Sequence, residues 1–164
     1  MTAERVGRPR SATRPPSGTA RAAALRLLSR RDYSAFEVRQ KLEDQGFSAD
    51  EVADTVSALS GERLIDDERV AQGYARVARD LECRGPLRIR RELEARGVAP
   101  GAIAAALGQW TADDEAAAIA RVIGRKRVGR RDPAARRRLY QHLLRRGFSR
   151  DVIAATLGRP DEDG

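Results

Sequence analysis

Cysteine and aromatic residues are scarce in this chain, and each scarcity excludes a class of structure. Cys83 is the single cysteine, which excludes an internal disulfide and a zinc site built from several cysteines. Aromatic residues make up 4% of the 164 residues, so aliphatic side chains must build the core. Such a core favours packed helices over a β-sandwich. We therefore expect an all-α protein.

Long apolar runs are also missing. No stretch approaches the roughly 18 consecutive apolar residues that a membrane-spanning helix needs. Residues 1–18 contain no apolar segment of the kind found in secretory signals. We expect no membrane partner, and the single cysteine favours a reducing, cytoplasmic location.

Signatures of catalysis are absent from the sequence as well. His142 is the only histidine, and the chain contains no P-loop, GxGxxG, HExxH or GxSxG motif. The acidic groups at 66–68 and 113–115 precede predicted helices, where they offset the positive end of the helix dipole. We expect a protein that is not an enzyme and has no cofactor, no metal and no small-molecule substrate. A metal-dependent nuclease is the minor alternative.

The positive charge is concentrated in one part of the chain. The sequence has 32 Lys and Arg residues against 24 Asp and Glu, a net charge of +8. Residues 120–150 hold twelve cationic residues and a single acid, Asp132, so this segment has a net charge of +11. Such a segment predicts a polyanion as partner. Residues 1–19 are predicted to be a disordered basic arm, and residues 159–164 an acidic tail.

Three segments of the chain repeat one pattern. They follow one another at offsets of 51 and 50 residues, and each places a glycine (Gly46, Gly97 or Gly147) four residues after a leucine. Glycine suits the left-handed residue that ends a helix, because it has no Cβ to clash. The pattern predicts a helix, a glycine turn and a second helix, repeated three times.

A further helix precedes each repeat. Apolar spacing predicts these helices over 19–31, with Leu25 and Leu28 facing inward, over 66–81, and over 113–126. In the second of them the expected inward stripe is Val70, Tyr74, Val77 and Leu81. Capping boxes are predicted at Ser34–Glu37, Ser48–Glu51 and Thr111–Asp114. The expected fold is an elongated tandem array of three three-helix, helix-turn-helix-like repeats over residues 20–62, 63–111 and 112–158.

Clusters of basic residues are the candidate binding site for nucleic acid or for an acidic groove on a protein. Guanidinium groups and helix N-termini both suit phosphate oxygens, and the scarcity of aromatics argues against a stacking platform for single strands. We therefore expect contacts to phosphates, weak in sequence preference and strongly dependent on salt. The candidate residues are Arg84, Arg88, Arg90 and Arg91, then Arg125, Lys126, Arg127, Arg130 and Arg131, and finally Arg136, Arg137 and Arg138.

Two motifs in the middle of the chain resemble one known family. The first runs from Leu64-Ile65-Asp66-Asp67 through Arg69, Ala71, Tyr74 and Arg76, and the second is Arg84-Gly85-Pro86 followed by Arg88-Ile89-Arg90, Glu92-Leu93 and Gly97-Val98. Together with the triple repeat, they are similar to the RecX family of bacterial regulators of the RecA recombinase, over residues 20–158. The resemblance implies a curved stack that lies in the groove of the RecA–DNA filament and inhibits its recombinase, ATPase and coprotease activities. It also implies that Arg76, with Arg84, Arg88, Arg90 and Arg91, forms the interaction face.

The leading hypothesis is a monomeric, non-catalytic modulator of the RecA filament that also contacts single- or double-stranded DNA through phosphates. The alternative is a free-standing helix-turn-helix transcription regulator, because each repeat contains a helix, a tight turn and a second helix. Residues 102–107 are rich in alanine and have no side chains that read base edges, which argues against that alternative.

Overall fold

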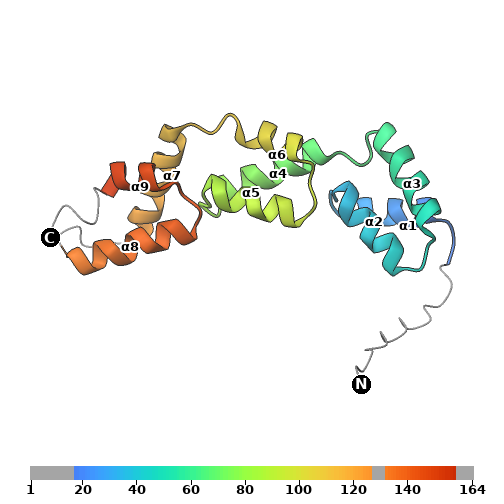
Figure 1. Ribbon diagram of the computed structural model, residues 1–164, viewed down its shortest axis with the longest axis horizontal. Coiled ribbons are helices and arrows are strands. Elements are labelled where there is room, and N and C mark those ends of the chain that lie inside the picture. Colours follow the sequence, from blue (N-terminus) through green and yellow to red (C-terminus); the bar gives the residue numbers. More distant parts are fainter. Residues whose placement is uncertain (1–16, 127–131, 158–164) are drawn as a thin grey trace, which may run out of the picture.

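The computed structural model describes residues 17–126 and 132–157, which form nine α-helices and no strand. The helices lie in chain order as three groups of three along one long axis (Figure 1). The first unit contains α1 (Ala20–Leu28), α2 (Ala35–Asp44) and α3 (Ala49–Gly61), the second α4 (Asp67–Asp80), α5 (Pro86–Ala95) and α6 (Pro100–Leu107), and the third α7 (Ala112–Lys126), α8 (Pro133–Arg145) and α9 (Arg150–Leu157). The predicted all-α array of three repeats is confirmed. The predicted tail and nearly all of the predicted N-terminal arm lie outside the described residues.

Each unit has a hydrophobic core of its own. The fully buried side chains include Leu42 and Leu59 in the first unit, Ile89 and Ile103 in the second, and Phe148 in the third. Because the cores are separate, the units stack end to end instead of merging into one globule, as in other helical repeat arrays.

The predicted glycine turns are present in all three units. Gly46, Gly97 and Gly147 have φ angles of +92°, +64° and +85°, the left-handed region that glycine adopts without strain. In each turn, the N–H of the residue after the glycine bonds back to the carbonyl oxygen of the leucine five positions earlier, at 3.1–3.3 Å. This is the Schellman arrangement, in which the turn satisfies carbonyl groups that the helix end leaves open.

The three predicted capping boxes are also confirmed. Ser34 and Glu37 cap each other reciprocally at α2, Ser48 and Glu51 do so at α3, and Thr111 and Asp114 do so at α7. Two other helices are capped by an acid from the first helix of their own unit. Asp67 accepts from the N–H of Ala99 before α6 (3.0 Å), and Glu115 accepts from the N–H and the hydroxyl of Ser149 before α9.

The predicted inward faces of α1 and α4 are partly wrong. Leu25 is exposed, and α1 buries alanines instead. On α4, Val77 and Leu81 are 46% and 69% exposed, whereas Val70 is buried together with Ala71, Ala75 and Ala78. Small side chains let α4 lie close to its neighbours, so the buried stripe is rotated toward the alanines and away from the larger apolar residues.

Candidate functional site

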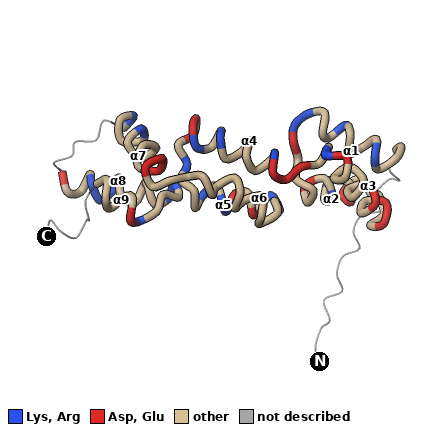
Figure 2. The backbone as a smooth tube through the Cα atoms, turned by 90° about the horizontal axis from the view of Figure 1, so that it is seen from above, with Lys and Arg blue, Asp and Glu red and all other residues tan. Residues whose placement is uncertain are grey.

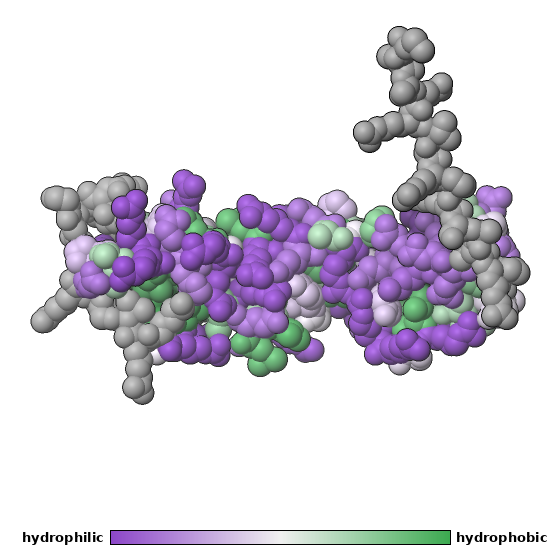
Figure 3. All heavy atoms as spheres, turned by 90° about the horizontal axis from the view of Figure 1, so that it is seen from below, coloured by the Kyte–Doolittle hydropathy of each residue, from purple (hydrophilic) through white to green (hydrophobic). Residues whose placement is uncertain are grey.

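Charged residues cover the whole row of units. Figure 2 shows cationic and acidic positions along the whole row, with acidic positions at α3, between α1 and α4, and at α7. The face in Figure 3 is mostly hydrophilic, and its hydrophobic patches are small and separate. A surface of this kind suits electrostatic contacts more than a broad apolar interface.

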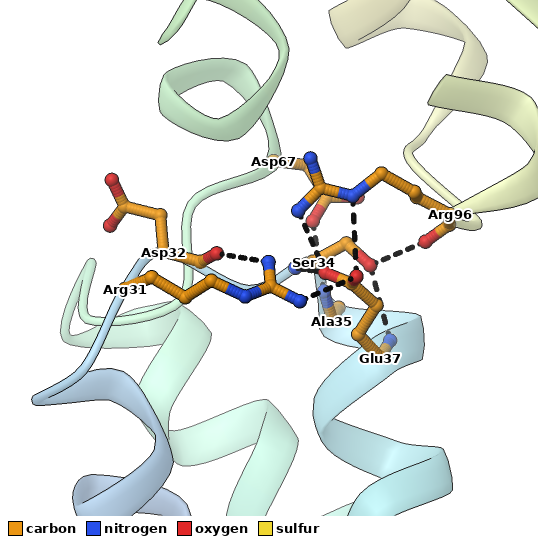
Figure 4. A network of polar contacts seen from close by, with 7 residues as sticks. All are labelled: Arg31, Asp32, Ser34, Ala35, Glu37, Asp67 and Arg96. Carbon is orange, nitrogen blue, oxygen red and sulfur yellow. Dashed lines mark hydrogen bonds and ion pairs between the residues drawn. The ribbon is translucent and has the colours of Figure 1, made fainter. Parts of the chain in front are cut away.

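The first and second units are joined by a network of polar side chains (Figure 4). The hydroxyl of Ser34 donates to the carbonyl oxygen of Arg96 (2.6 Å), and the guanidinium of Arg96 donates to the carboxylate of Glu37 (3.1 Å). The carboxylate of Asp67 accepts from the N–H of Ala35 (2.9 Å). Because Asp67 also caps α6, one carboxylate holds helix ends in both units.

The Glu37 carboxylate at this junction is stabilised in its charged form. Burial alone would raise the pKa of Glu37, but hydrogen bonds from Arg96, from the Ser34 N–H and from Arg31 outweigh it and hold the pKa below its usual 4.5. A lowered pKa contributes stability above pH 4.5 that is lost as the pH falls through the folded-state pKa. The first junction is therefore sensitive to acid.

Replacing this carboxylate tests that dependence. We expect Glu37→Gln to lower the free energy of unfolding at pH 7 by about 1–2 kcal/mol, because charge-assisted hydrogen bonds are weakened. The difference from the wild type should shrink as the pH falls below about 4.5, where the wild-type carboxylate also becomes protonated. Urea unfolding at several pH values measures this. Glu43→Gln, an exposed residue of the same helix, is the control, and an equal, pH-independent loss in both variants would contradict the expectation.

The second and third units are joined mainly through the backbone. The N–H of Gly85 donates to the carbonyl oxygen of Arg146 (2.8 Å), and the N–H of Leu87 donates to that of Gly147 (3.1 Å). The guanidinium of Arg146 donates in return to the carbonyl oxygens of Glu82 and Cys83. Cys83 itself is fully buried in the core of the third unit, although it precedes α5. The second unit thus contributes a side chain to the core of the third.

One arginine position serves both junctions. Arg96 and Arg146 lie at equivalent places after the second helix of their units, and each reaches back to the preceding unit. The first unit has Gln45 at this place. The repeat offset of 50 residues aligns the two arginines in the sequence, but that alignment does not predict which groups they contact.

Two of the predicted interaction residues are used internally. Arg84 pairs with Glu92 (2.8 Å) and Glu82 (2.9 Å) and donates to the hydroxyl of Tyr74, and Arg88 pairs with Glu92 (2.9 Å). Burial raises the pKa of Glu92, but the hydrogen bonds from Arg88, Tyr74 and Arg84 outweigh it and lower the pKa below its usual range. This network ties α4 to α5, so a structural role accounts for Arg84 and Arg88.

The other residues of the predicted interaction face are open to solvent. Arg76 on α4 and Arg90 and Arg91 on α5 are exposed, and none of them pairs with an acid among the described residues. Each is available to a partner without first breaking an ion pair.

The second basic group is described only in part, and the third lies on α8. Arg125 is exposed in the last turn of α7, which ends at Lys126, and the side chain of Lys126 is not described. Arg127, Arg130 and Arg131 lie outside the described residues. On α8, Arg136 is half-buried, Arg137 is exposed, and the exposed Arg138 lies 3.5 Å from a carboxylate oxygen of Asp132.

The described residues contain neither a metal site nor a membrane span, but they do contain a cavity. Residues 17–126 and 132–157 contain no cluster of three or more His, Cys, Asp or Glu side chains that could hold a metal ion. None of the helices in these residues is long and apolar enough to span a membrane. One cavity that the sequence does not predict lies between α4 and the end of α6, lined by Arg76, Arg79 and Trp110 among others.

Comparison with known proteins identifies all three units. Residues 20–59 match the family description "RecX, first three-helix domain", residues 66–107 match "RecX, second three-helix domain", and residues 113–157 match "RecX, third three-helix domain". The chain is 40% identical over 150 residues to the regulatory protein RecX of Halorhodospira halophila, covering 90% of this chain and 91% of that protein. It is 35% identical over 137 residues to the regulatory protein RecX of Geobacillus kaustophilus, covering 82% of this chain and 51% of that protein.

Solved structures have the same architecture. A crystal structure of RecX from Lactobacillus salivarius superimposes with a TM-score of 0.75 at 24% identity, over 87% of this chain and 94% of that one, which shows the shared fold. A second crystal structure of a regulatory protein RecX superimposes with a TM-score of 0.72 at 25% identity, over 84% of this chain and 69% of that one. Matches to all three domains and to relatives of similar length agree, and this chain belongs to the RecX family of regulatory proteins.

Proposed function

We propose that this chain is a non-catalytic modulator of RecA that lies in the groove of the RecA–DNA filament and inhibits recombinase, ATPase and coprotease activity. The observation that carries the proposal is the row of three units held at two hydrogen-bonded junctions (Figure 1). Such a row reaches across more than one repeating subunit of a filament, which a globule of the same mass does not. The family supplies RecA as the partner.

Contacts to DNA phosphates complete the proposal. Arg90 and Arg91 are exposed on the second unit, and Arg125 and Arg137 are exposed on the third. Arginines of this kind bind phosphate oxygens of single- or double-stranded DNA without reading bases, so binding weakens steeply with salt. We propose a monomer that acts in the cytoplasm.

The inhibition must arise from unequal affinity for two states of the filament. A ligand shifts an equilibrium only by binding one state more tightly than the other. By lying along the groove, the row would bind a filament state that does not hydrolyse ATP or that disassembles.

The third helices of the first and second units do not support the alternative of a sequence-reading transcription regulator. On α6 the exposed residues include Ala104 and Ala105, which have no polar groups for base edges. On α3 they include Asp50, Glu51 and Asp54, whose charge repels phosphates.

The direct test is RecA-catalysed ATP hydrolysis on single-stranded DNA. We expect the rate to fall as this protein is added, with most of the effect reached at or below one copy per RecA subunit, because each row covers several subunits. Bovine serum albumin at equal concentration is the control. An unchanged ATPase rate and unchanged strand exchange at saturating protein would contradict the proposal, and a DNA footprint confined to one operator would favour the transcription regulator.

A further inference from the structure

A cavity lies between α4 and the end of α6, and neither Tyr74 nor Glu92 lines it. Its volume is about 130 Å³. Its lining is rich in hydrogen-bond donors, and the residues are Gln72, Ala75, Arg76, Arg79, Ala106, Gln109 and Trp110. No carboxylate lines the cavity, so its chemistry suits an anion.

Trp110 supplies a donor that has no acceptor in the described part of the chain. The ring is partly buried against the core of the second unit, and its indole Nε1 is shielded from solvent. A buried N–H without an acceptor is costly, and such groups in native proteins point to a ligand or an ordered water. Because the N–H has almost no accessible surface, an oxygen atom of a bound anion satisfies it only after the ring turns toward the cavity.

The guanidinium groups at the cavity make the surroundings positive. Arg79 pairs with Asp80 (2.8 Å), whereas Arg76 has no ion pair within the described residues. The hydrogen bond from Arg79, together with the charges of Arg121 and Arg76, lowers the pKa of Asp80. Three arginines therefore act on one acid, and Asp114 also acts on Arg79. The net positive charge of these arginines and aspartates favours a ligand with a single negative charge.

The positive side chains continue from the cavity along α7. Arg121 and Arg125 are both exposed and lie four residues apart, so they share one face of the helix about 6 Å apart along its axis. Arg121 is near enough to Asp80 to lower its pKa, and Arg125 lies in the last turn of α7. A nucleic acid strand carries phosphates along its length, so one strand contacts both the cavity and these arginines. An isolated carboxylate on a protein contacts only one of them.

We propose that the cavity between α4 and α6 binds one phosphodiester group of a nucleic acid strand, with Arg76 and the indole N–H of Trp110 as its donors. The strand then continues along Arg121 and Arg125. This inference rests on the proposed function for the presence of DNA beside the chain, and it names a particular contact. Arg79, Arg121 and Trp110 are residues that the predicted site did not contain.

The test measures binding of a fluorescein-labelled 20-nucleotide oligo-dT by fluorescence anisotropy at several salt concentrations. We expect Arg76→Gln to weaken binding about tenfold at low salt and to reduce the salt slope by about 0.7, the value for one single-strand phosphate contact. Trp110→Phe keeps the ring and removes the N–H, so we expect a loss of about threefold with an unchanged salt slope. Arg39→Gln, an exposed arginine of the first unit, is the matched control and should leave both quantities near wild type.

A second measurement uses Trp110 as the only tryptophan of the chain. In the wild-type protein, oligo-dT should change the tryptophan emission, whereas a peptide nucleic acid of the same bases, which lacks phosphates, should not. Binding of Arg76→Gln and Trp110→Phe indistinguishable from that of Arg39→Gln would overturn the inference. The inference would also be overturned if these two variants bound oligo-dT as the wild type does but bound DNA-free RecA more weakly. That result would assign the cavity to a carboxylate of a protein partner. Suppression of the RecA ATPase by wild-type protein is judged separately, so the proposed function stands or falls on its own result.

Discussion

Replacing Gly147 with alanine should detach the third unit from the second and lower the free energy of unfolding by about 3 kcal/mol. Gly147 has a φ of +85°, which strains any residue with a Cβ. A Cβ there would also lie 2.3 Å from the backbone N and the Cβ of Arg88. These atoms belong to the start of α5 and cannot rotate away, so the two units must separate. Urea unfolding measures the loss, and hydrogen exchange should show lower protection in α8 and α9 than in α2 and α3.

Two further glycine variants separate backbone strain from the clash. Gly46→Ala introduces a Cβ at the equivalent turn of the first unit, where φ is +92°, and should cost only the strain of about 1–2 kcal/mol. Gly85→Ala has no such strain, but its Cβ would lie 2.3 Å from the carbonyl carbon of Gly147. We expect it to weaken the same junction by about 1–3 kcal/mol. If Gly85→Ala matched the wild type, the backbone contact would not hold the units together.

Removing charge from the end of α7 and the residues that follow it should have the largest effect on DNA binding. With Arg125, Arg127, Arg130 and Arg131 replaced by glutamine, we expect affinity for duplex DNA to fall at least about a hundredfold at low salt. The slope of log K against log salt should become shallower by about 2–3, because most of the four side chains release counterions when they bind phosphates. Anisotropy titrations of a labelled duplex at increasing salt measure both quantities.

The matched control removes the same charge from the first unit. Arg26, Arg30, Arg39 and Arg63 are exposed arginines, and their replacement by glutamine leaves the segment after α7 intact. We expect this variant to lose little affinity and to keep a salt slope within about one unit of the wild type. Equal losses of affinity in the two variants would show that only the total charge matters. An unaltered salt slope in the variant that lacks Arg125, Arg127, Arg130 and Arg131 would show that these arginines stay solvated in the complex.

Local features of the fold could be predicted because each depends on a few neighbouring residues. The turns at Gly46, Gly97 and Gly147 and the capping box of Ser34 and Glu37 are examples. The buried face of α4 could not be predicted in the same way. Apolar size favours Val77 and Leu81, but close packing between helices selects alanines such as Ala75, and only the neighbouring helix shows how close the packing is.

The candidate site was harder to predict than the fold, because charge in a sequence does not show which charges are already paired. Arg84 and Arg91 look alike in the sequence, yet Arg84 is held by Glu92 and Tyr74, and Arg91 is exposed. The cavity beside Trp110 combines two helices and a loop, so no single stretch of residues indicates it. The spacing of Arg76 and Arg79 on one helix was the signal that could have pointed to it.

The two junctions of the row differ in chemistry, and this difference makes the protein a rod with two unlike joints. The joint at Glu37 and Arg96 depends on charge, so acid or a competing anion loosens it. The joint at Gly85 and Gly147 depends mainly on amide groups in close contact, and its one charged group, Arg146, keeps its charge in acid. A partner that bends the rod would therefore meet less resistance at the first joint, and the second and third units would move as one arm.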